Sequence, residues 1–363
     1  MGGERTEYIP WDNGMMELES QENTDHPIMS IIVCTLNRAH ILETVCLASL
    51  AVQELPGRVE LIVCDASEDT ATETVVREWG SAHPDWACTY VQATQRGSCS
   101  QRNQAIHLSH GDLLVFLDDD LELLLGALLE LWRSYQMKGE AYGGFEILQI
   151  AEKETGLGRL ILNTAKSLFW SLFGLATVSN KRRVQPSGYN VGGRPVTQKT
   201  ALSLIRQAEF VDDVEWMSGG GMGIRREVFL VEGLQFDESL QRYGGYAWAE
   251  DVAMSVAIRT KAFLRLVECR RSWAIHHPVP GGRMSQRRFA AARVYNFYLI
   301  GSMAGYSRLR RRISWARAQV GLMVGSLAWG CVHCSVDRVV GTIDGWKAVR
   351  LLPPESGEVV VHD

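Results

Sequence analysis

The 363-residue sequence lacks the features of a membrane-spanning, exported or disulfide-bonded chain. No window reaches the roughly 20 apolar residues that a transmembrane helix needs. Residues 1–27 are polar and acidic without the apolar core of a secretory signal, so we expect a polar tail and a cytoplasmic protein. The eight cysteines are scattered, which argues against a disulfide framework. Cys331 and Cys334 have half of a zinc-site spacing, but no second pair accompanies them.

One region of the chain has few basic residues and another has few acidic residues. Residues 1–150 carry 24 Asp and Glu against 8 Lys and Arg, whereas residues 259–317 carry 14 Lys and Arg against the single acid Glu268. The basic region favours an anionic partner: phosphate, acidic lipid or nucleic acid. The content of 46% hydrophobic and 22% charged residues is that of an ordinary folded protein, long enough for one large domain or two smaller ones.

From residue 28 onward, strand and helix patterns alternate. Buried strands are predicted at residues 29–35, 59–64, 88–92 and 113–117, and helices at 39–53, 71–79 and 101–109. This alternation predicts an α/β fold with a doubly wound, mostly parallel sheet flanked by helices. Ligands bind at the carboxyl ends of the strands in such sheets, and Thr35, Asp65 and the triplet Asp118–Asp120 stand at three of these ends.

The triplet Asp118-Asp119-Asp120 carries the strongest chemical signal. It ends a run of five apolar residues, and adjacent carboxylates repel one another unless a cation lies among them. Because alternate residues of an extended chain point the same way, Asp118 and Asp120 can converge while Asp119 points elsewhere. Their hard oxygens favour Mg²⁺ or Mn²⁺, which keep positions open for phosphate oxygens. A solvated acidic loop is the alternative.

The second half of the chain is less regular. We expect a helical stretch at 121–138, a strand near 142–150, a buried or interfacial helix within 157–178, a helix over 252–261, a strand at 263–267, a short strand ending at residues 276–277 and a flexible loop at 280–283. The glycines at 219–221 allow close approach of the backbone to a ligand. Glu250 and Asp251 open the helix over 252–261, where acids also have a purely structural role in stabilising the helix N-terminus.

In this order, the motifs resemble those of the family 2 glycosyltransferases, which have the GT-A nucleotide-sugar fold. The resemblance covers about residues 28–298. It rests on Ser30–Arg38, Val63–Asp69, Arg96-Gly97 with Arg102-Asn103, Phe116–Asp120, Gly219–Arg226, Phe236–Glu238, Glu250-Asp251 and His276-His277. Each motif is weak alone, and their joint order is what makes the resemblance specific.

The resemblance implies a role for each matching residue. The nucleotide-sugar side comprises Thr35, Asn37, Arg38, Asp65, Arg102, Asp118 and Asp119, with Asp65 accepting from the base. Asp118 and Asp120 look like the family's DxD pair for Mn²⁺ or Mg²⁺, and the resemblance favours Asp120 over Asp118 as the direct ligand. The further metal-side residue is His276 or His277, since the apolar alternation does not fix which one faces the site. Asp251, with Glu250 beside it, looks like the catalytic base for the acceptor hydroxyl.

Aromatic residues near the expected base have two interpretations. Trp216, Gly220, Tyr246 and Trp248 could contact the acceptor, the aromatic faces stacking on its sugar rings. The same aromatic residues could instead only pack the loop that carries the base.

The C-terminal region is basic and partly apolar. Arg308 and Arg310–Arg312 precede about 15 mainly apolar residues at 318–332, too few to span a bilayer reliably. A basic cluster beside a short apolar helix fits attachment to an anionic membrane surface, and the alternative is a packed helix with solvated arginines. We therefore expect four parts: a polar tail (1–27), a nucleotide-sugar-binding half (28–120), an acceptor-binding and catalytic half (121–305), and a C-terminal extension (306–363) that contacts the inner face of a membrane.

The resemblance thus implies an inverting glycosyltransferase that moves one sugar from a nucleoside-diphosphate sugar, most commonly UDP-linked in this family, to a glycan or polyprenyl-linked acceptor, and we expect no nucleic-acid partner. The Q-x-x-R-W motif of processive synthases is absent, because Gln286–Phe289 has the wrong spacing. A nucleotidyltransferase acting on sugar phosphates would carry a basic, Gly-rich loop after its first strand, unlike Thr35–Arg38. A non-catalytic carbohydrate-binding protein would tolerate Asp251→Asn.

Overall fold

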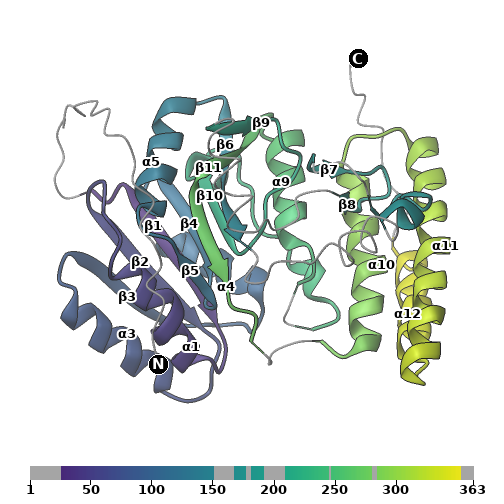
Figure 1. The fold of residues 1–363 in the computed structure, drawn as a ribbon, viewed down its shortest axis with the longest axis horizontal. Helices are drawn as coiled ribbons and strands as arrows, with labels where there is room; N and C mark the ends of the chain where they lie inside the picture. The colour runs from purple at the N-terminus through teal and green to yellow at the C-terminus, as the bar shows by residue number, and fades with distance from the viewer. Residues whose placement is uncertain are drawn as a thin grey trace, which may run out of the picture.

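The structure is a computed structural model that describes residues 26–150, 167–176, 181–191, 209–244, 247–279 and 284–352. Its centre is a nine-stranded sheet in the order β3-β2-β1-β4-β10-β6-β11-β5, with β9 paired to β11. Figure 1 shows that helices α10, α11 and α12 stand together at one end of the molecule, beyond α9. The α/β fold expected from the sequence, with a helical C-terminal region, is confirmed.

The first half of the sheet is parallel, as predicted. Its strands are β1 (Met29–Thr35), β2 (Val59–Asp65), β3 (Trp86–Gln92) and β4 (Leu113–Asp118). Between them lie α1 (Ala39–Ile41), a π-helical turn (Leu42–Leu47) and α2 (Ala48–Leu50), then α3 (Ala71–Ala82) and α4 (Ser98–Leu108). β1, β2 and β4 are almost entirely buried and mostly apolar, because helices cover both faces of this parallel part of the sheet.

The second half of the sheet is mixed. β10 (Gly221–Arg225) is antiparallel to β4 and to β6 (Tyr142–Ile150). β11 (Arg265–His276) is parallel to β6. Two short strands, β5 (Leu121–Leu123) and β9 (Phe210–Asp212), are antiparallel to β11. The helices here are α5 (Ala127–Lys138), α8 (Glu227–Leu230), a 3₁₀ helix (Glu238–Gln241) and α9 (Glu250–Thr260), and β7 (Arg183–Val184) pairs with β8 (Asn190–Val191). Of the glycines at 219–221, Gly221 begins strand β10, and Gly219 and Gly220 precede it.

Two predictions of secondary structure were wrong. Residues 121–123 form strand β5 and not the start of a helix, which begins at Ala127 after Gly126 in the left-handed region (φ 79°). The two short strands expected at 263–267 and before the histidines are one strand, β11. An irregularity in its register between Cys269 and Trp273 interrupts the pairing with β6, and this break hides the continuity of the strand in the sequence.

Two apolar cores lie on opposite faces of the sheet. Successive strand residues alternate between them, so Ile31 and Val115 enter the core under α1–α3 and α5, while Ile32 and Phe116 enter the core under α4, α9 and α10. This packing fixes the strands from both sides. The carboxyl ends of β1, β2 and β4 are consequently held at one edge of the sheet.

The C-terminal helices are α10 (Gln286–Met303), α11 (Arg308–His333) and α12 (Asp337–Arg350). α12 approaches α10 at two glycines: a Cβ on Gly341 would lie 2.1 Å from the carbonyl oxygen of Arg287, and one on Gly345 would lie 2.6 Å from Cβ of Val294. The predicted apolar stretch 318–332 belongs to α11, in one helix with the preceding arginines. None of the described helices combines the length and the apolar character that crossing a bilayer requires.

Several predicted segments lie outside the described residues. These are residues 1–25 of the polar tail, most of the segment 157–178, the loop 280–283 and the C-terminal residues 353–363.

Candidate active site

Polar residues gather at the carboxyl edge of the parallel strands. In the strand pairing, Thr35 at the end of β1 stands opposite Asp65 at the end of β2, and Cys34 stands opposite Asp118 at the end of β4. The three strand ends singled out in the sequence therefore lie side by side.

The three aspartates differ in their contacts and in the exposure of their side chains. Asp119 accepts a hydrogen bond from Thr35 (Oγ1 to Oδ2, 2.7 Å) and one from Arg38 (2.8 Å), which also contacts Asp120 at 3.3 Å. The Asp119 side chain is 5% exposed, whereas that of Asp118 is 42% exposed. Burial raises the pKa of Asp119 to about 6, although Thr35 and Arg38 favour its charged form. Asp119 thus points away from its neighbours, as the alternation predicted.

Asp118, Asp120 and His276 form a candidate metal centre. Each offers one ligand atom, and these atoms all lie within 4.8 Å of one another; His276 Nε2 is 3.1 Å from Asp120 Oδ1. Burial raises the pKa of Asp120, but the bond and charge of His276 outweigh it and the pKa is lowered. Two carboxylate oxygens and one imidazole nitrogen fit Mn²⁺ or Mg²⁺ and leave coordination positions for other oxygens.

His277 faces away from this group. Its Nε2 contacts Glu122 Oε2 at 2.6 Å, while its backbone N–H donates to the carbonyl of Asp120 (2.9 Å). The pairing of His276 with Leu121 of β5 sets this orientation. Of the two histidines that the sequence left open, His276 is the one beside the carboxylates.

The loops after β1 and β2 are tied to each other beside the triplet. Asp65 is fully buried and accepts from the Ser67 N–H (2.9 Å), the Ser67 hydroxyl (2.5 Å) and Tyr90 (3.3 Å). The backbone N–H of Asn37, which has a φ of 54°, donates to Ser67 Oγ at 2.7 Å. Asp65 therefore orders both loops through its own hydrogen bonds.

Arg102 joins the triplet to the second half of the chain. This buried residue of α4 donates to Glu250 at 2.5 Å and approaches Asp118 Oδ1 and the Gly219 carbonyl at 3.5 Å each. Burial lowers the pKa of Arg102, but the charges of Glu250 and Asp118 outweigh it and the pKa is raised, so the guanidinium stays charged. Burial raises the pKa of Glu250 to about 7, against the opposing charge of Arg102.

Asp251 lies at the start of α9, beside Gly219. Its Oδ2 accepts from the Gly219 N–H and its Oδ1 from the Val252 N–H, each at 2.8 Å. Burial raises the pKa of Asp251, and the two N–H donors oppose this only in part. Asp251 is half-buried whereas Glu250 is buried and bonded to Arg102, so Asp251 is the carboxylate accessible from solvent.

Gly219 and Gly220 separate Asp251 from Asp118. A Cβ on Gly219 would lie 3.0 Å from Cβ of Asp251, and one on Gly220 would lie 3.0 Å from Asp118 Oδ2 and 2.7 Å from Gln149 Nε2. The Gly220 carbonyl accepts from the Asp118 N–H at 3.3 Å. Side chains at these two positions would crowd the carboxylates of Asp251 and Asp118.

The aromatic residues expected to contact an acceptor differ in position. Trp216 is buried, donates to the Val191 carbonyl (3.1 Å) and lies under the Arg182 guanidinium (4.7 Å), which is a packing environment. Trp248 is half-buried, with its ring edge-on to Phe289 at 4.8 Å. Tyr246 lies outside the described residues.

Sequence reasoning missed a buried charged group beneath the site. Glu146 of β6 accepts from the Ser218 N–H (2.9 Å) and pairs with Arg182 at 2.6 Å. Burial raises the pKa of Glu146 to about 8. The available signal was one glutamate in an otherwise uncharged strand, and its partner Arg182 comes from a distant segment.

Comparison with known proteins supports the resemblance seen in the sequence motifs. Residues 30–200, just under half of the chain, match the model described as glycosyl transferase family 2. Among its relatives, glycosyltransferase AglE of Haloferax volcanii is 30% identical over 95 residues, 26% of this chain and 31% of the relative. The GalNAc(5)-diNAcBac-PP-undecaprenol beta-1,3-glucosyltransferase of Campylobacter jejuni is 31% identical over 133 residues, 37% of this chain and 41% of the relative. The matched regions span less than half of either relative.

Two solved structures are similar at low identity. The mannosyltransferase PcManGT from Pyrobaculum calidifontis, in complex with GDP-Man and Mn²⁺, has a TM-score of 0.48 and 17% identity, covering 90% of this chain and 86% of that chain. S. aureus TarS 1-349 in complex with UDP-GlcNAc has a TM-score of 0.47 and 16% identity, covering 80% and 71%.

The candidate metal centre makes a direct prediction about the two histidines. In the presence of UDP, Mn²⁺ binding should weaken by about tenfold or more in His276→Gln and in Asp118→Asn, since each removes a ligand. His277→Gln is the matched control and should bind Mn²⁺ normally, because its ring contacts Glu122. Electron paramagnetic resonance of free Mn²⁺ measures the binding of Mn²⁺ to each of these variants. Equal losses for the two histidine variants would contradict the assignment.

Proposed function

We propose that the protein is an inverting glycosyltransferase that moves one sugar from a nucleoside-diphosphate sugar, with UDP as the first candidate, to a hydroxyl of a glycan or lipid-linked acceptor. The observation that carries the proposal is a pair of carboxylate sites on either side of Gly219-Gly220. One comprises Asp118, Asp120 and His276, and the other is Asp251. A single displacement needs such a division, because the base must lie opposite the leaving group.

On the donor side, Asp118, Asp120 and His276 would hold a divalent cation, which when bound would supply positive charge for the departing diphosphate. Arg102, kept charged by its buried carboxylate partners, adds a fixed positive charge nearby. Thr35, Asn37 and Asp65 line the nucleotide side, and Asp119 anchors Arg38 there.

On the acceptor side, Asp251 is the general base. The acceptor oxygen forms its bond to the anomeric carbon, the proton passes to an Asp251 carboxylate oxygen, and the diphosphate leaves with the electron pair of the breaking C–O bond. The N–H groups of Gly219 and Val252 orient the carboxylate. Glu250 is bonded to Arg102, so it supports the site electrostatically without receiving the proton.

These roles agree with the proposed division of the chain at residue 120. Residues 28–120 supply the nucleotide side and two metal ligands, and residues 121–305 supply His276 and the base. The lipid-linked acceptor is supported by the Campylobacter relative, whose name gives a PP-undecaprenol-linked substrate.

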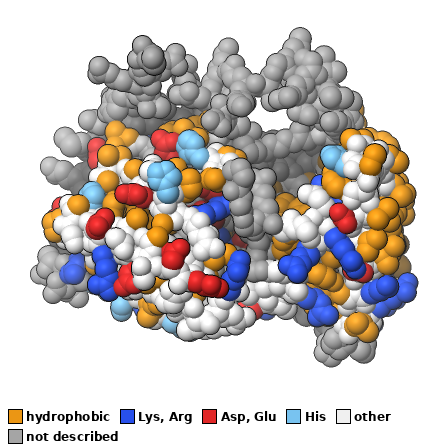
Figure 2. All heavy atoms as spheres, turned by 90° about the horizontal axis from the view of Figure 1, so that it is seen from below, with side chains coloured by type: hydrophobic (Ala, Val, Ile, Leu, Met, Phe, Trp, Pro, Cys, Tyr) orange, Lys and Arg blue, Asp and Glu red, His pale blue; other side chains and the backbone are white. Residues whose placement is uncertain are grey.

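Residues 306–363 form the extension for which we propose peripheral membrane contact. α11 exposes apolar and basic side chains together: Leu309, Ile313, Val320, Val324 and Leu327, beside Arg308, Arg310 and Arg312. Figure 2 shows hydrophobic side chains along the outer edge of the C-terminal helical region with Lys and Arg side chains near them. Such a surface suits the interface of an anionic membrane.

Replacement of the base tests the mechanism. Asp251→Asn should lower the rate of sugar transfer by roughly 10²–10⁴-fold, because the amide cannot accept the hydroxyl proton. Binding of UDP with Mn²⁺ should remain, since Asp251 is not among the metal-side residues. Transfer is measured by mass spectrometry of the product, with the exposed Glu232→Gln as a control of equal charge change. Transfer that survives in Asp251→Asn would place the base elsewhere.

The transfer rate should also depend on pH. Burial raises the pKa of Asp251, so the base becomes protonated as the pH falls through a value above the ordinary 3.9 or so of an aspartate. The acid limb of kcat should therefore lie above this value and fall about tenfold per pH unit. Binding of the donor over the same pH range separates this effect from loss of substrate. A rate that stays constant down to pH 4 contradicts the assigned base.

A further inference from the structure

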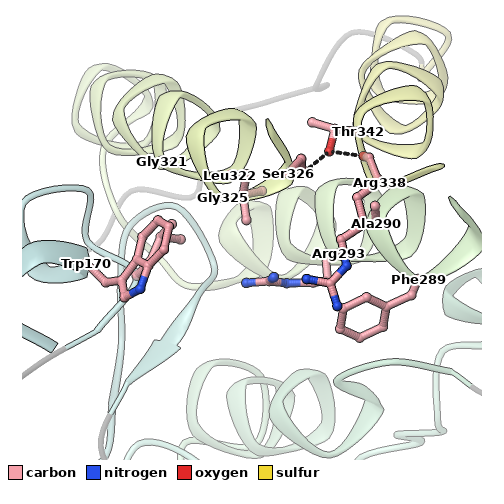
Figure 3. A pocket seen from close by; sticks show the side chains of 11 residues that line it. Trp170, Phe289, Ala290, Arg293, Gly321, Leu322, Gly325, Ser326, Arg338 and Thr342 are labelled. Carbon is pink, nitrogen blue, oxygen red and sulfur yellow. Dashed lines mark hydrogen bonds between the residues drawn. The ribbon is translucent and has the colours of Figure 1, made fainter. Parts of the chain in front are cut away.

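A cavity of about 300 Å³ lies in the C-terminal helical region, apart from the aspartate triplet. Its walls come from α10, α11, α12 and the segment 167–176. Trp170, Phe289 and Leu322 contribute apolar surface, and Arg293 and Arg338 contribute charge. Figure 3 shows both guanidinium groups in the space between Trp170 and Phe289.

The walls of this cavity are held in place by close packing. A Cβ on Gly325 of α11 would lie 3.0 Å from the Trp170 ring, so the glycine lets the segment 167–176 approach the helix. The hydroxyls of Ser326 and Thr342 lie 3.1 Å apart and link α11 to α12. The cavity is therefore preformed, which lowers the entropic cost of binding a ligand there.

The two arginines lie against one aromatic ring. The guanidinium carbons of Arg293 and Arg338 lie 5.7 and 5.8 Å from the centroid of the Phe289 ring. Arg338 donates to Gln286 (2.8 Å) and also lies over Trp329 (4.5 Å). In the part of the chain that the structure describes, neither arginine forms an ion pair with a carboxylate. Burial is the main cause that lowers the pKa of Arg338, and the positive charge of Arg293 lowers it further. Two like charges in this setting are complementary to an anion.

Exposed apolar side chains stand next in sequence to Trp170, which lines the cavity. Leu168, Phe169 and Leu172 are 55%, 46% and 67% exposed, and they flank Trp170 in the chain. Exposed apolar residues gathered beside an anion-binding group favour a ligand with a hydrocarbon chain over a free phosphate ion.

α10 connects the cavity with the acceptor side of the candidate active site. Phe289, which lies in the cavity wall, packs edge-on against Trp248. The Asn296 side chain of the same helix donates to the Trp248 carbonyl at 2.8 Å. Trp248 is three residues before Asp251 in the chain. A ligand anchored in the cavity would thus approach the site from the side of the base.

We propose that this cavity binds the phosphate or diphosphate of a polyprenyl-linked acceptor. Arg293 and Arg338 hold the phosphate oxygens, while Trp170 and the exposed residues beside it contact the first isoprene units. The inference rests on the proposed glycosyltransferase function and extends it, because it assigns the part of the acceptor that is recognised away from the reacting hydroxyl.

Farnesyl diphosphate serves as the probe, titrated calorimetrically into the full chain with EDTA present so that no metal assists diphosphate binding at the aspartates. One molecule should bind per chain, and inorganic pyrophosphate and farnesol should each bind about tenfold more weakly or worse, since each lacks half of the recognised chemistry. Pyrophosphate that binds as tightly as farnesyl diphosphate overturns the lipid assignment, and so does farnesol that binds as tightly.

Variants test the residues. Arg293→Gln with Arg338→Gln should weaken binding of farnesyl diphosphate by about tenfold or more, and Arg338→Lys, which keeps the charge, should weaken it less. Arg350→Gln, an exposed arginine on the same helix as Arg338, is the matched control and should bind normally. Undiminished binding in the double variant, or an equal loss in Arg350→Gln, overturns the proposal.

Donor measurements keep this test separate from the proposed function. The double variant should retain binding of UDP with Mn²⁺, which also shows that it is folded. If lipid-phosphate binding does not need the two arginines while donor turnover is intact, the cavity proposal alone fails. If no nucleotide sugar is turned over by the wild type, the proposed function fails whatever the cavity binds. If the double variant does not fold, two measurements still test the proposal. One is binding of farnesyl diphosphate to Arg338→Lys, and the other is the comparison of farnesyl diphosphate, pyrophosphate and farnesol in the wild type.

Discussion

The buried ion pair between Arg102 and Glu250 is the interaction on which the arrangement of the site depends. It joins α4, which follows the third strand of the parallel half, to the N-terminus of α9 at 2.5 Å. Both side chains are almost fully buried, so removal of either partner would leave an uncompensated charge at a cost of about 3–5 kcal/mol. Through its second contact, 3.5 Å from Asp118, Arg102 also fixes the position of the triplet relative to Asp251. One cation thus sets the relation between the two carboxylate sites.

The same charge balance explains why the three aspartates can occupy one strand end. Arg38 neutralises Asp119 and Asp120, His276 contacts Asp120, and Arg102 lies near Asp118. Asp118 has the longest of these contacts and the most exposed side chain of the three. A divalent cation beside Asp118 and Asp120 would supply the positive charge that these contacts leave incomplete. The acidity of the sequence around the triplet therefore agrees with the proposed donor site.

The sequence predicted most of the parallel half of the sheet and the residues at its strand ends, because continuous apolar strands and their polar termini are local patterns. It could not choose between His276 and His277, since that choice depends on the antiparallel pairing of β11 with β5, a short strand whose residues have a helical pattern. It also missed pairs formed between distant segments. Glu146 with Arg182, and Arg293 with Arg338, become visible only when the chain is folded.

The central claim is that Asp118, Asp120 and His276 form a metal-dependent donor site for a nucleoside-diphosphate sugar. The most direct measurement is turnover of a panel of UDP- and GDP-linked sugars by the purified chain, with Mn²⁺, with Mg²⁺ and with EDTA. The account predicts release of nucleoside diphosphate from at least one donor with a divalent cation and its loss in EDTA. Turnover that is unaffected by EDTA, or no turnover of any donor, would contradict the account.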